Sequence, residues 1–265
     1  MAGISKRLQE EDQYLPCRIL SLSENETRAA KSTGFKPFPT IEQIRKVIFA
    51  MPDITEVEKR NRALIAFTLL TGARDGAISS LKLKHIDLEH NLVNQDPREV
   101  KTKTRKQIDT FFFPVGDDIK QIFVDWVKYM KEEKLYGNDD PLFPRTQLVQ
   151  SENNGFIAGG LEPIHWNSAS QIREIFKTSF EAAGLAYFNP HSFRKTVVNL
   201  GEKLCKNPEE FKAWSQNLGH ESPLTTFTSY GYVPVNRQGK IIRGIGKADT
   251  SKEDKLDLIM QKLGI

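Results

Sequence analysis

The chain has 265 residues, of which 38% are hydrophobic, a formal net charge of +4 and a sequence pI of about 8.9. This apolar content, with 16 Phe, excludes a disordered chain and suffices for one large domain or two small ones. No apolar stretch could span a bilayer, the polar N-terminus excludes a signal peptide, and two cysteines, Cys17 and Cys205, are too few for a disulfide framework. We therefore expect an intracellular, cytoplasmic protein whose mildly basic charge permits nucleic-acid binding without demonstrating it.

The start of the chain differs from the rest. It is polar, contains Pro16 and Pro37 and shows only weak periodicity, so we interpret residues 1–38 as an N-terminal arm or interdomain linker. From Ile41 onward, apolar residues repeat at helical spacing. The ordered domain is therefore expected to cover residues 39–265.

Two capped helices are expected to open this domain. Thr40 with Gln43, and Thr55 with Glu58, have the spacing of a capping box, in which a threonine and a later Glu or Gln bond each other's backbone N–H groups. The second helix should end at Gly72, because glycine readily adopts the left-handed conformation that closes a helix.

The next part of the chain is predicted to be rich in short strands. We expect a short helix over 76–83, then two or three small antiparallel strands within 92–95, 98–103 and 107–115, which are rich in β-forming residues and separated by polar turns. An amphipathic helix follows over 117–133. Its apolar stripe consists of Ile119, Ile122, Phe123, Trp126 and Met130.

The remainder is predicted to be helical, apart from a Gly- and Asn-containing loop over 145–167. Ser168 and Gln171 have capping-box spacing for a helix over 168–180. Further helices are expected over 191–204, over 207–219 with Asn207 as N-cap and Pro208 in the first turn, from Ser222, and over 251–263. Together these elements predict a mainly α fold with a small antiparallel β-sheet, in the α+β class.

The segment PHSFRKT places His191 and Arg194 three residues apart, so on a helix the two side chains face the same way. A histidine and an arginine that converge on one point form a reasonable anion site. A surface histidine and a surface arginine on an amphipathic helix would give the same pattern, so this motif alone does not decide.

The segment NLGHESPLTTFTSYGY gathers a histidine, two threonines and two tyrosines. Its Leu-Gly pair indicates a helix end followed by a turn, which places His220 at the edge of a loop. Tyr230 and Tyr232 follow soon after. Taken alone, a packed tyrosine and a turn histidine are the simpler interpretation.

Two basic segments complete the set of candidates. Arg74 follows an apolar helix and a glycine and precedes another helix, where backbone N–H groups favour anions. A predicted hairpin, VKTKTRKQ, carries Lys101, Lys103, Arg105 and Lys106. A charge run of this kind is usually a solvated turn or a non-specific phosphate contact.

The order of these motifs along the chain resembles the tyrosine recombinases of the phage-integrase family. TGAR, the lysine hairpin, HxxR, LGH and a tyrosine follow one another over about residues 39–240, and HxxR with the LGH-x-S-x-x-TT run is the most specific part. The resemblance implies the tyrosine-recombinase catalytic-domain fold. It also implies a site-specific DNA recombinase, or integrase, that cleaves and rejoins strands through a 3′-phosphotyrosine intermediate without metal, ATP or another cofactor.

The family's site residues carry over one by one. The resemblance implies six catalytic residues: Tyr230 as nucleophile, Arg74 and Arg194 on the phosphate, His191 as base for the tyrosine, Lys103 as acid for the leaving oxygen, and His220 as hydrogen-bond donor to the phosphate. It also implies DNA contacts by four basic residues: Lys101, Arg105, Lys106 and Lys195.

This sequence departs from the family pattern in three places. Ala77 stands where the family often has Glu, so Asp75 or a neighbour is expected to orient Arg74. Tyr230 lies one residue beyond the usual offset from the second histidine, which leaves Tyr232 as a rival nucleophile. The hairpin offers several lysines, and we choose Lys103, with Lys101 and Lys106 as alternates.

The resemblance also implies partners. They are double-stranded DNA and further copies of the chain, assembled as a tetramer that exchanges the C-terminal helix over 251–263; packing of that helix on its own domain is an equal alternative. A bacterial or phage-encoded mobile element is the implied setting. Because residues 1–38 are too few for the helical domain that usually precedes the catalytic one, the alternatives are a catalytic fragment and an unusually short native protein. We favour the fragment and expect it to bind its site weakly.

Other functions remain open. A type IB topoisomerase uses the same chemistry without exchanging DNA partners. A non-catalytic DNA-binding protein would use the basic hairpin and helices only to hold phosphates, but it predicts loss of a tyrosine or an arginine, and all candidates are present. A helical structural protein with accidental motifs is the third alternative.

Overall fold

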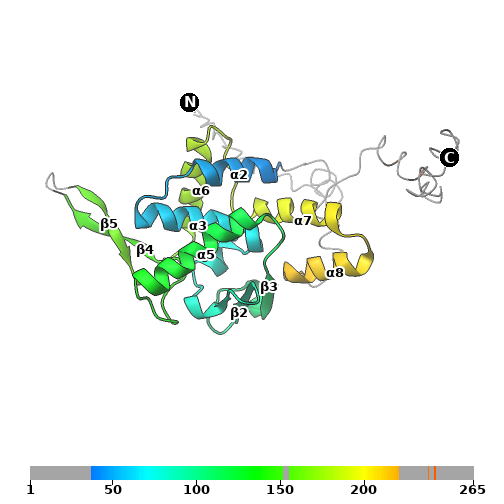
Figure 1. The fold of residues 1–265 in the computed structure, drawn as a ribbon, viewed down its shortest axis with the longest axis horizontal. Coiled ribbons are helices and arrows are strands. Elements are labelled where there is room, and N and C mark those ends of the chain that lie inside the picture. Colours follow the sequence, from blue (N-terminus) through cyan, green and yellow to red (C-terminus); the bar gives the residue numbers. More distant parts are fainter. Residues whose placement is uncertain (1–36, 152–154, 221–237, 239–241, 243–265) are drawn as a thin grey trace, which may run out of the picture. The chain divides into compact units, whose positions relative to one another are not determined.

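Helices α3 (Glu56–Thr71) and α5 (Asp117–Lys128) lie against each other in the computed structural model (Figure 1). The structure describes residues 37–151 and 155–220, with Gln238 and Ile242 as isolated positions. The other helical elements are α2 (Ile41–Ala50), α4 (Asp75–Ile78), η1 (Leu83–His85), η2 (Lys103–Arg105), η3 (Tyr129–Glu133), α6 (Ser170–Ala182), α7 (Ser192–Leu204) and α8 (Pro208–Asn217). The strands are β1 (Ile86–Asp87), β2 (Leu92–Gln95), β3 (Ile108–Phe111), β4 (Arg145–Gln150) and β5 (Phe156–Glu162).

Both predicted capping boxes at the start of the domain are confirmed. The hydroxyls of Thr40 and Thr55 each accept a hydrogen bond from the backbone N–H three residues later, at 3.2 Å, and the reciprocal side-chain bonds are present. Gly72 closes α3 as predicted, in a left-handed conformation with a φ of 59°. These local signals fix where α3 begins and where it ends, two residues before Arg74.

The core consists of aliphatic side chains around a group of aromatic rings. Every residue of α3 from Ala63 to Thr71 is buried, so other elements cover this helix on all sides. The ring centroid of Phe67 lies 4.8 Å from that of Phe123 in α5 and 5.5 Å from that of Phe143. Burying each such ring contributes about 1.5–3 kcal/mol. Four residues of the stripe predicted for 117–133 are buried: Ile119, Phe123, Trp126 and Met130.

The helix predicted over 76–83 is shorter than expected, because α4 ends at Ile78. The hydroxyls of Ser79 and Ser80 donate to the carbonyls of Gly76, at 2.8 Å, and Ala77, at 3.0 Å. Serine hydroxyls that bond nearby backbone carbonyls compete with continuation of a helix.

A three-stranded antiparallel sheet follows, in the order β1-β2-β3, and confirms the strands predicted at 92–95 and within 107–115. The strand predicted over 98–103 is wrong. The carbonyl of Asp96 accepts backbone N–H groups from Glu99 at 3.0 Å and Val100 at 2.7 Å, and Pro97 has no N–H to offer a sheet. The chain therefore turns away after β2, and the predicted lysine hairpin is a longer loop over 96–107 that contains η2.

The loop predicted over 145–167 is also wrong, because the segment contains a hairpin of β4 and β5 that projects from the helices in Figure 1. The strands pair antiparallel from Arg145 with Glu162 to Gln150 with Phe156. Most of their side chains are exposed, including Phe156 at 74%. No buried apolar face therefore marks these strands in the sequence.

The later helices begin near the predicted positions. Asn207 caps α8 as predicted and accepts the N–H of Glu210 at 2.9 Å, with Pro208 in the first turn. The capping box predicted from Ser168 and Gln171 is wrong: α6 begins at Ser170, whose N–H the Ser168 hydroxyl accepts at 3.3 Å. The helices predicted from Ser222 and over 251–263, and residues 1–36 of the predicted arm, lie outside the described residues.

The described part of the chain is thus mainly α-helical with two small antiparallel sheets, which confirms the predicted α+β class and adds one sheet to it. None of its helices combines the length and the apolar character needed to cross a membrane.

Candidate functional site

Arg194 lies in the first turn of α7 and is only 6% exposed. Its Nη1 donates to the carbonyl oxygen of Gly72 at 2.6 Å, and its Nη2 donates to that of Leu218 at 2.6 Å. Nη2 also lies 2.8 Å from Nε2 of His220. One guanidinium therefore joins the end of α3, the start of α7 and the end of α8.

The environment of Arg194 leaves its charge uncompensated within the described residues. Among the described residues its acceptors are two neutral carbonyls and a histidine ring, and no described carboxylate pairs with it. Burial, and then the charge of Arg74, lower the pKa of Arg194 to about 9, so the group is still charged at neutral pH. A buried cation without a counter-charge is costly, and a bound anion would remove that cost.

Arg74 follows the left-handed turn at Gly72 and is the N-cap residue of α4. Its side chain is half-buried, and this burial lowers its pKa. No described residue accepts a hydrogen bond from its guanidinium. The expectation that Asp75 orients Arg74 is wrong, because the Asp75 carboxylate accepts from Nε of Arg173 at 2.8 Å instead.

Two histidines lie within the electrostatic field of these arginines. Burial, then Arg194 and Arg74, lower the pKa of His220 to about 4. The same causes, in the same order, lower the pKa of His191, the N-cap residue of α7, although its side chain is partly open to solvent. Both rings are therefore neutral at pH 7. The predicted cluster of Arg74, His191, Arg194 and His220 is thus brought together in space.

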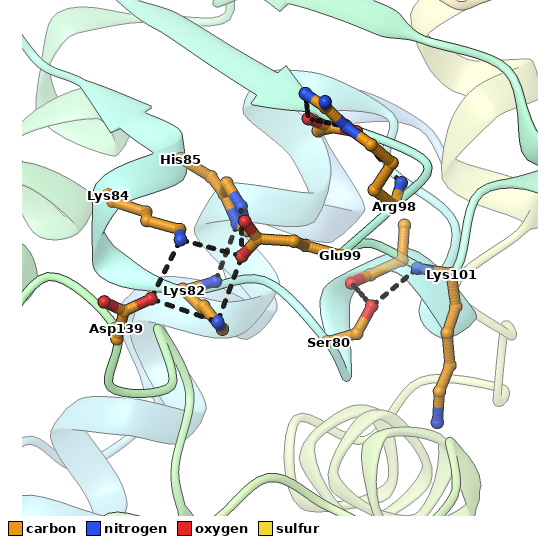
Figure 2. A network of polar contacts seen from close by, with 10 residues as sticks. Ser80, Lys82, Lys84, His85, Arg98, Glu99, Lys101 and Asp139 are labelled. Atoms are coloured by element: carbon orange, nitrogen blue, oxygen red, sulfur yellow. Dashed lines mark hydrogen bonds and ion pairs between the residues drawn. The ribbon is translucent and has the colours of Figure 1, made fainter.

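Lys103 is also brought to this cluster. It lines a small cavity together with Arg74, Arg194, Thr102, Gln95 and Thr110. Figure 2 shows the Lys101 side chain pointing away from Ser80 and Glu99. The Lys101 ammonium acts on His165 instead, because burial, and then the charges of Lys82 and Lys101, lower the pKa of that histidine. The cavity therefore favours Lys103 over Lys101 as the lysine of the site.

The remaining predicted DNA contacts lie nearby on the surface. Arg105 and Lys106 are exposed in the loop over 96–107. Lys195 of α7 is half-buried, and its charge lowers the pKa of His191 after the larger effects of burial and of the two arginines. The segment over 221–237, which contains Tyr230 and its rival Tyr232, lies outside the described residues.

Sequence reasoning missed Asn217, which fixes the end of α8 on the sheet. Its side-chain Nδ2 donates to the carbonyl of Phe111 at 2.8 Å, and its Oδ1 accepts the Phe111 N–H at 2.7 Å. The Thr110 hydroxyl also donates to the Asn217 carbonyl at 3.1 Å. This pairing positions Leu218 and His220, and no local sequence signal indicates it, because the two partners lie 106 positions apart. Among the residues that the structure describes, no His, Cys, Asp or Glu cluster is placed to hold a metal ion.

The sequence model of the Phage integrase family matches residues 40–236. A tyrosine recombinase XerC from Lactobacillus leichmannii is 26% identical over 186 residues, which cover 70% of this chain and 55% of that protein. A XerC from Lactobacillus delbrueckii subsp. bulgaricus is 24% identical over 189 residues, with the same coverage. The chain thus spans about half the length of the curated relatives it matches.

Solved structures share the fold. The crystal structure of XerA recombinase aligns with a TM-score of 0.53 at 16% identity and covers 81% of this chain and 65% of that one. The post-cleavage complex of XerH site-specific recombinase with a palindromic difH substrate aligns with a TM-score of 0.52 at 19% identity, over 80% of this chain and 54% of that one.

Proposed function

This chain belongs to the phage integrase family, and from that membership we propose that it is a site-specific DNA recombinase that cuts and rejoins strands through Tyr230. The fold that it shares with XerA and XerH is the tyrosine-recombinase fold predicted from the motifs. One observation carries the proposal: two arginines and two neutral histidines converge beside Lys103, and Arg194 has no described carboxylate partner.

The two arginines bind the scissile phosphate. A guanidinium has five N–H donors, and the described contacts of Arg194 use three of them, which leaves two for the non-bridging oxygens. Both arginines stabilise the extra negative charge of the pentacoordinate transition state, worth about 3 kcal/mol for each well-placed donor. Arginine suits this role at Arg74, whose guanidinium has no described acceptor, because its fork fits two oxygens at once.

His220 presents a defined tautomer to that phosphate. An arginine can only donate, so Nε2 of His220 must accept the bond from Arg194 at 2.8 Å. In a neutral ring the proton is then on Nδ1. The lowered pKa keeps the ring in this form at neutral pH, and Nδ1–H is the donor that it offers to a phosphate oxygen.

The reaction needs one proton removed and one supplied. A tyrosine has a pKa of about 10, so only about one in a thousand is ionised at neutral pH. Neutral His191 accepts the Tyr230 proton as the phenolic oxygen attacks phosphorus. The bond from phosphorus to the 5′ oxygen breaks, and Lys103 gives that oxygen a proton. The phosphotyrosine keeps the bond energy for rejoining, so rejoining needs no ATP, and each step of this mechanism is assigned to a side chain rather than to a metal ion.

The DNA itself is held by the basic surface around the site. Lys101, Arg105, Lys106 and Lys195 contact backbone phosphates and position the duplex without reading its sequence. Recombination joins two duplexes, so the working form is a tetramer on DNA that exchanges the segment over 251–263. The XerH structure is itself a complex with its difH substrate.

The proposal is tested with a suicide substrate, a duplex nicked near the cleavage position, incubated with protein in EDTA and analysed on a denaturing gel. We expect a covalent adduct that disappears in Tyr230→Phe and persists in Tyr232→Phe. The reverse pattern would keep the family's chemistry and reassign the nucleophile. No adduct on a duplex that the protein binds would contradict the proposal in favour of a non-catalytic DNA-binding protein.

A further inference from the structure

Glu99 lies four residues before Lys103, in the loop between β2 and β3. Its Oε2 lies 3.0 Å from Nζ of Lys82 and 2.8 Å from Nζ of Lys84 (Figure 2). Asp139 contacts the same two ammonium groups from another segment, at 3.1 and 2.8 Å. Two carboxylates thus share two lysines, but only Glu99 belongs to the loop that carries Lys103.

A buried histidine lies beside the carboxylate of Glu99 (Figure 2). His85 is 5% exposed, and its Nδ1 accepts the backbone N–H of Lys82 at 3.0 Å. In the neutral ring the proton is therefore on Nε2, which lies 3.7 Å from Oε2 of Glu99. Lys82, Lys84 and His85 thus surround one carboxylate oxygen of the loop.

The loop is attached at a second point two residues later. The backbone N–H of Lys101 donates to the Ser80 hydroxyl at 2.8 Å, and that hydroxyl donates to the carbonyl of Ala77 at 3.0 Å. Between the two attachments, Val100 is 2% exposed. The residues that contact the loop come after α4 in the chain, and α4 begins directly after Arg74. They are Ser80, Lys82, Lys84 and His85.

We propose that Glu99 is a positioning residue for Lys103: its ion pairs hold the lysine loop, residues 96–107, against Lys82 and Lys84, which follow Arg74 and α4 in the chain. This inference rests on the proposed function. A general acid must be held close to its target oxygen, and Lys103 itself lies in an exposed turn of only three residues. Ion pairs as exposed as those of Glu99 contribute little to the free energy of unfolding. We therefore expect their loss to change the position of the loop rather than the stability of the domain.

Glu99 should affect one chemical step, the protonation of the leaving oxygen. Lys103 protonates the leaving 5′ oxygen, whereas the arginines and His191 serve the attack on phosphorus. A substrate with sulfur in place of that oxygen has a thiolate as its leaving group, and because a thiolate is far less basic than an alkoxide, it needs no proton from the enzyme. Displacement of Lys103 should therefore slow cleavage of the oxygen substrate alone.

The test compares two nicked duplexes, identical except for oxygen or sulfur at the bridging 5′ position, with wild type, Glu99→Gln and Asp139→Asn. Asp139→Asn is the matched control, because it removes a carboxylate from the same two lysines without altering the loop. We expect Glu99→Gln to slow cleavage of the oxygen substrate by about tenfold or more, within the range of general acid catalysis, and to leave the sulfur substrate within about twofold of wild type. Asp139→Asn should stay within about twofold on both.

Two results would overturn the inference. Glu99→Gln could cleave the oxygen substrate as fast as wild type, or it could lose activity equally on both substrates, which indicates general damage. Failure of the proposed function is distinct, because wild type would then form no adduct with either duplex. Lys103→Ala sets the scale, since it should show the same selective loss in a stronger form.

Discussion

Arg194 shows why the type of side chain matters at this site as much as its charge. Its planar guanidinium reaches the carbonyls of Gly72 and Leu218 and the ring of His220 simultaneously. A lysine ammonium keeps the charge but cannot reproduce this fork. The site therefore depends on a cation that is both buried and fixed in orientation.

We expect Arg194→Lys to lower the single-turnover rate of adduct formation by about 100-fold or more, as for the loss of a transition-state donor. Arg173→Lys is the control, because Arg173 pairs with Asp75 at a surface position that is 58% exposed. That variant should cleave at nearly the wild-type rate. Equal rates for Arg194→Lys and wild type would contradict the role of the fork.

His220 makes the free energy of unfolding depend on pH in the absence of DNA. Its pKa of about 4 lies below the value of about 6.5 expected in the unfolded chain. The unfolded chain therefore binds the proton first as pH falls. The stability contribution is complete above pH 6.5 and is lost progressively between pH 6.5 and 4, by at most about 1.4 kcal/mol per pH unit.

The measurement is the free energy of unfolding from urea titrations at pH 7.5, 6 and 5. We expect it to fall with pH in wild type and to fall less steeply in His220→Gln, which lacks this proton site. Histidines outside the cluster whose pKa is lowered, such as His85, contribute equally to both proteins, so the difference reports on His220 and its coupling to His191. Parallel curves would show that the ring is not held in its neutral form.

Sequence motifs at the residue scale were sufficient to find the side chains that converge, because HxxR, LGH and TGAR are short and local. They were insufficient for the surroundings of those side chains. The pairing of Asp75 with Arg173, and of Asn217 with Phe111, depends on contacts between residues about a hundred positions apart. Spacing along a loop likewise did not settle which lysine lines the cavity.

At the scale of elements, helices with local signals were predicted well and strands without a buried face were not. The boxes at Thr40 and Thr55 and the cap at Asn207 use only neighbouring residues, so the sequence contains all the information needed. The β4–β5 hairpin exposes apolar residues such as Leu148 and Phe156, and exposure removes the alternating pattern that identifies a strand.

Gly72 connects element geometry to the site. Its φ is 59°, and a Cβ added there would lie 2.7 Å from Cδ2 of the buried Leu218, whose carbonyl holds Arg194. Gly184 is a matched control, with a φ of 68° and nothing within 4 Å of an added Cβ. The two positions thus share backbone strain and differ in crowding.

We expect Gly184→Ala to cost about 1 kcal/mol of unfolding free energy, from the left-handed backbone alone. Gly72→Ala should cost about 1–3 kcal/mol more, because the methyl group overpacks the junction, and it should also slow cleavage. Chemical denaturation and the adduct assay measure the two effects. Equal losses of stability in both variants would show that the junction at Leu218 can absorb a methyl group.

At the scale of the whole molecule, the site is assembled from four distant segments: the turn between α3 and α4, the lysine loop, the start of α7 and the end of α8. Periodicity cannot predict such a junction, because it describes each segment separately. The order of the motifs indicated it only through resemblance to a family, and the match over residues 40–236 established that family.

Strand cleavage through Tyr230 is tested most directly by locating the nucleotide on the trapped adduct. The adduct formed in EDTA with a nicked duplex is digested with nuclease and trypsin, and the tryptic peptide that spans Tyr230 and Tyr232 is sequenced by fragmentation mass spectrometry. We expect a 3′-phosphonucleotide on Tyr230. A nucleotide on any other residue, or no modified peptide from a protein that binds the duplex, would contradict it.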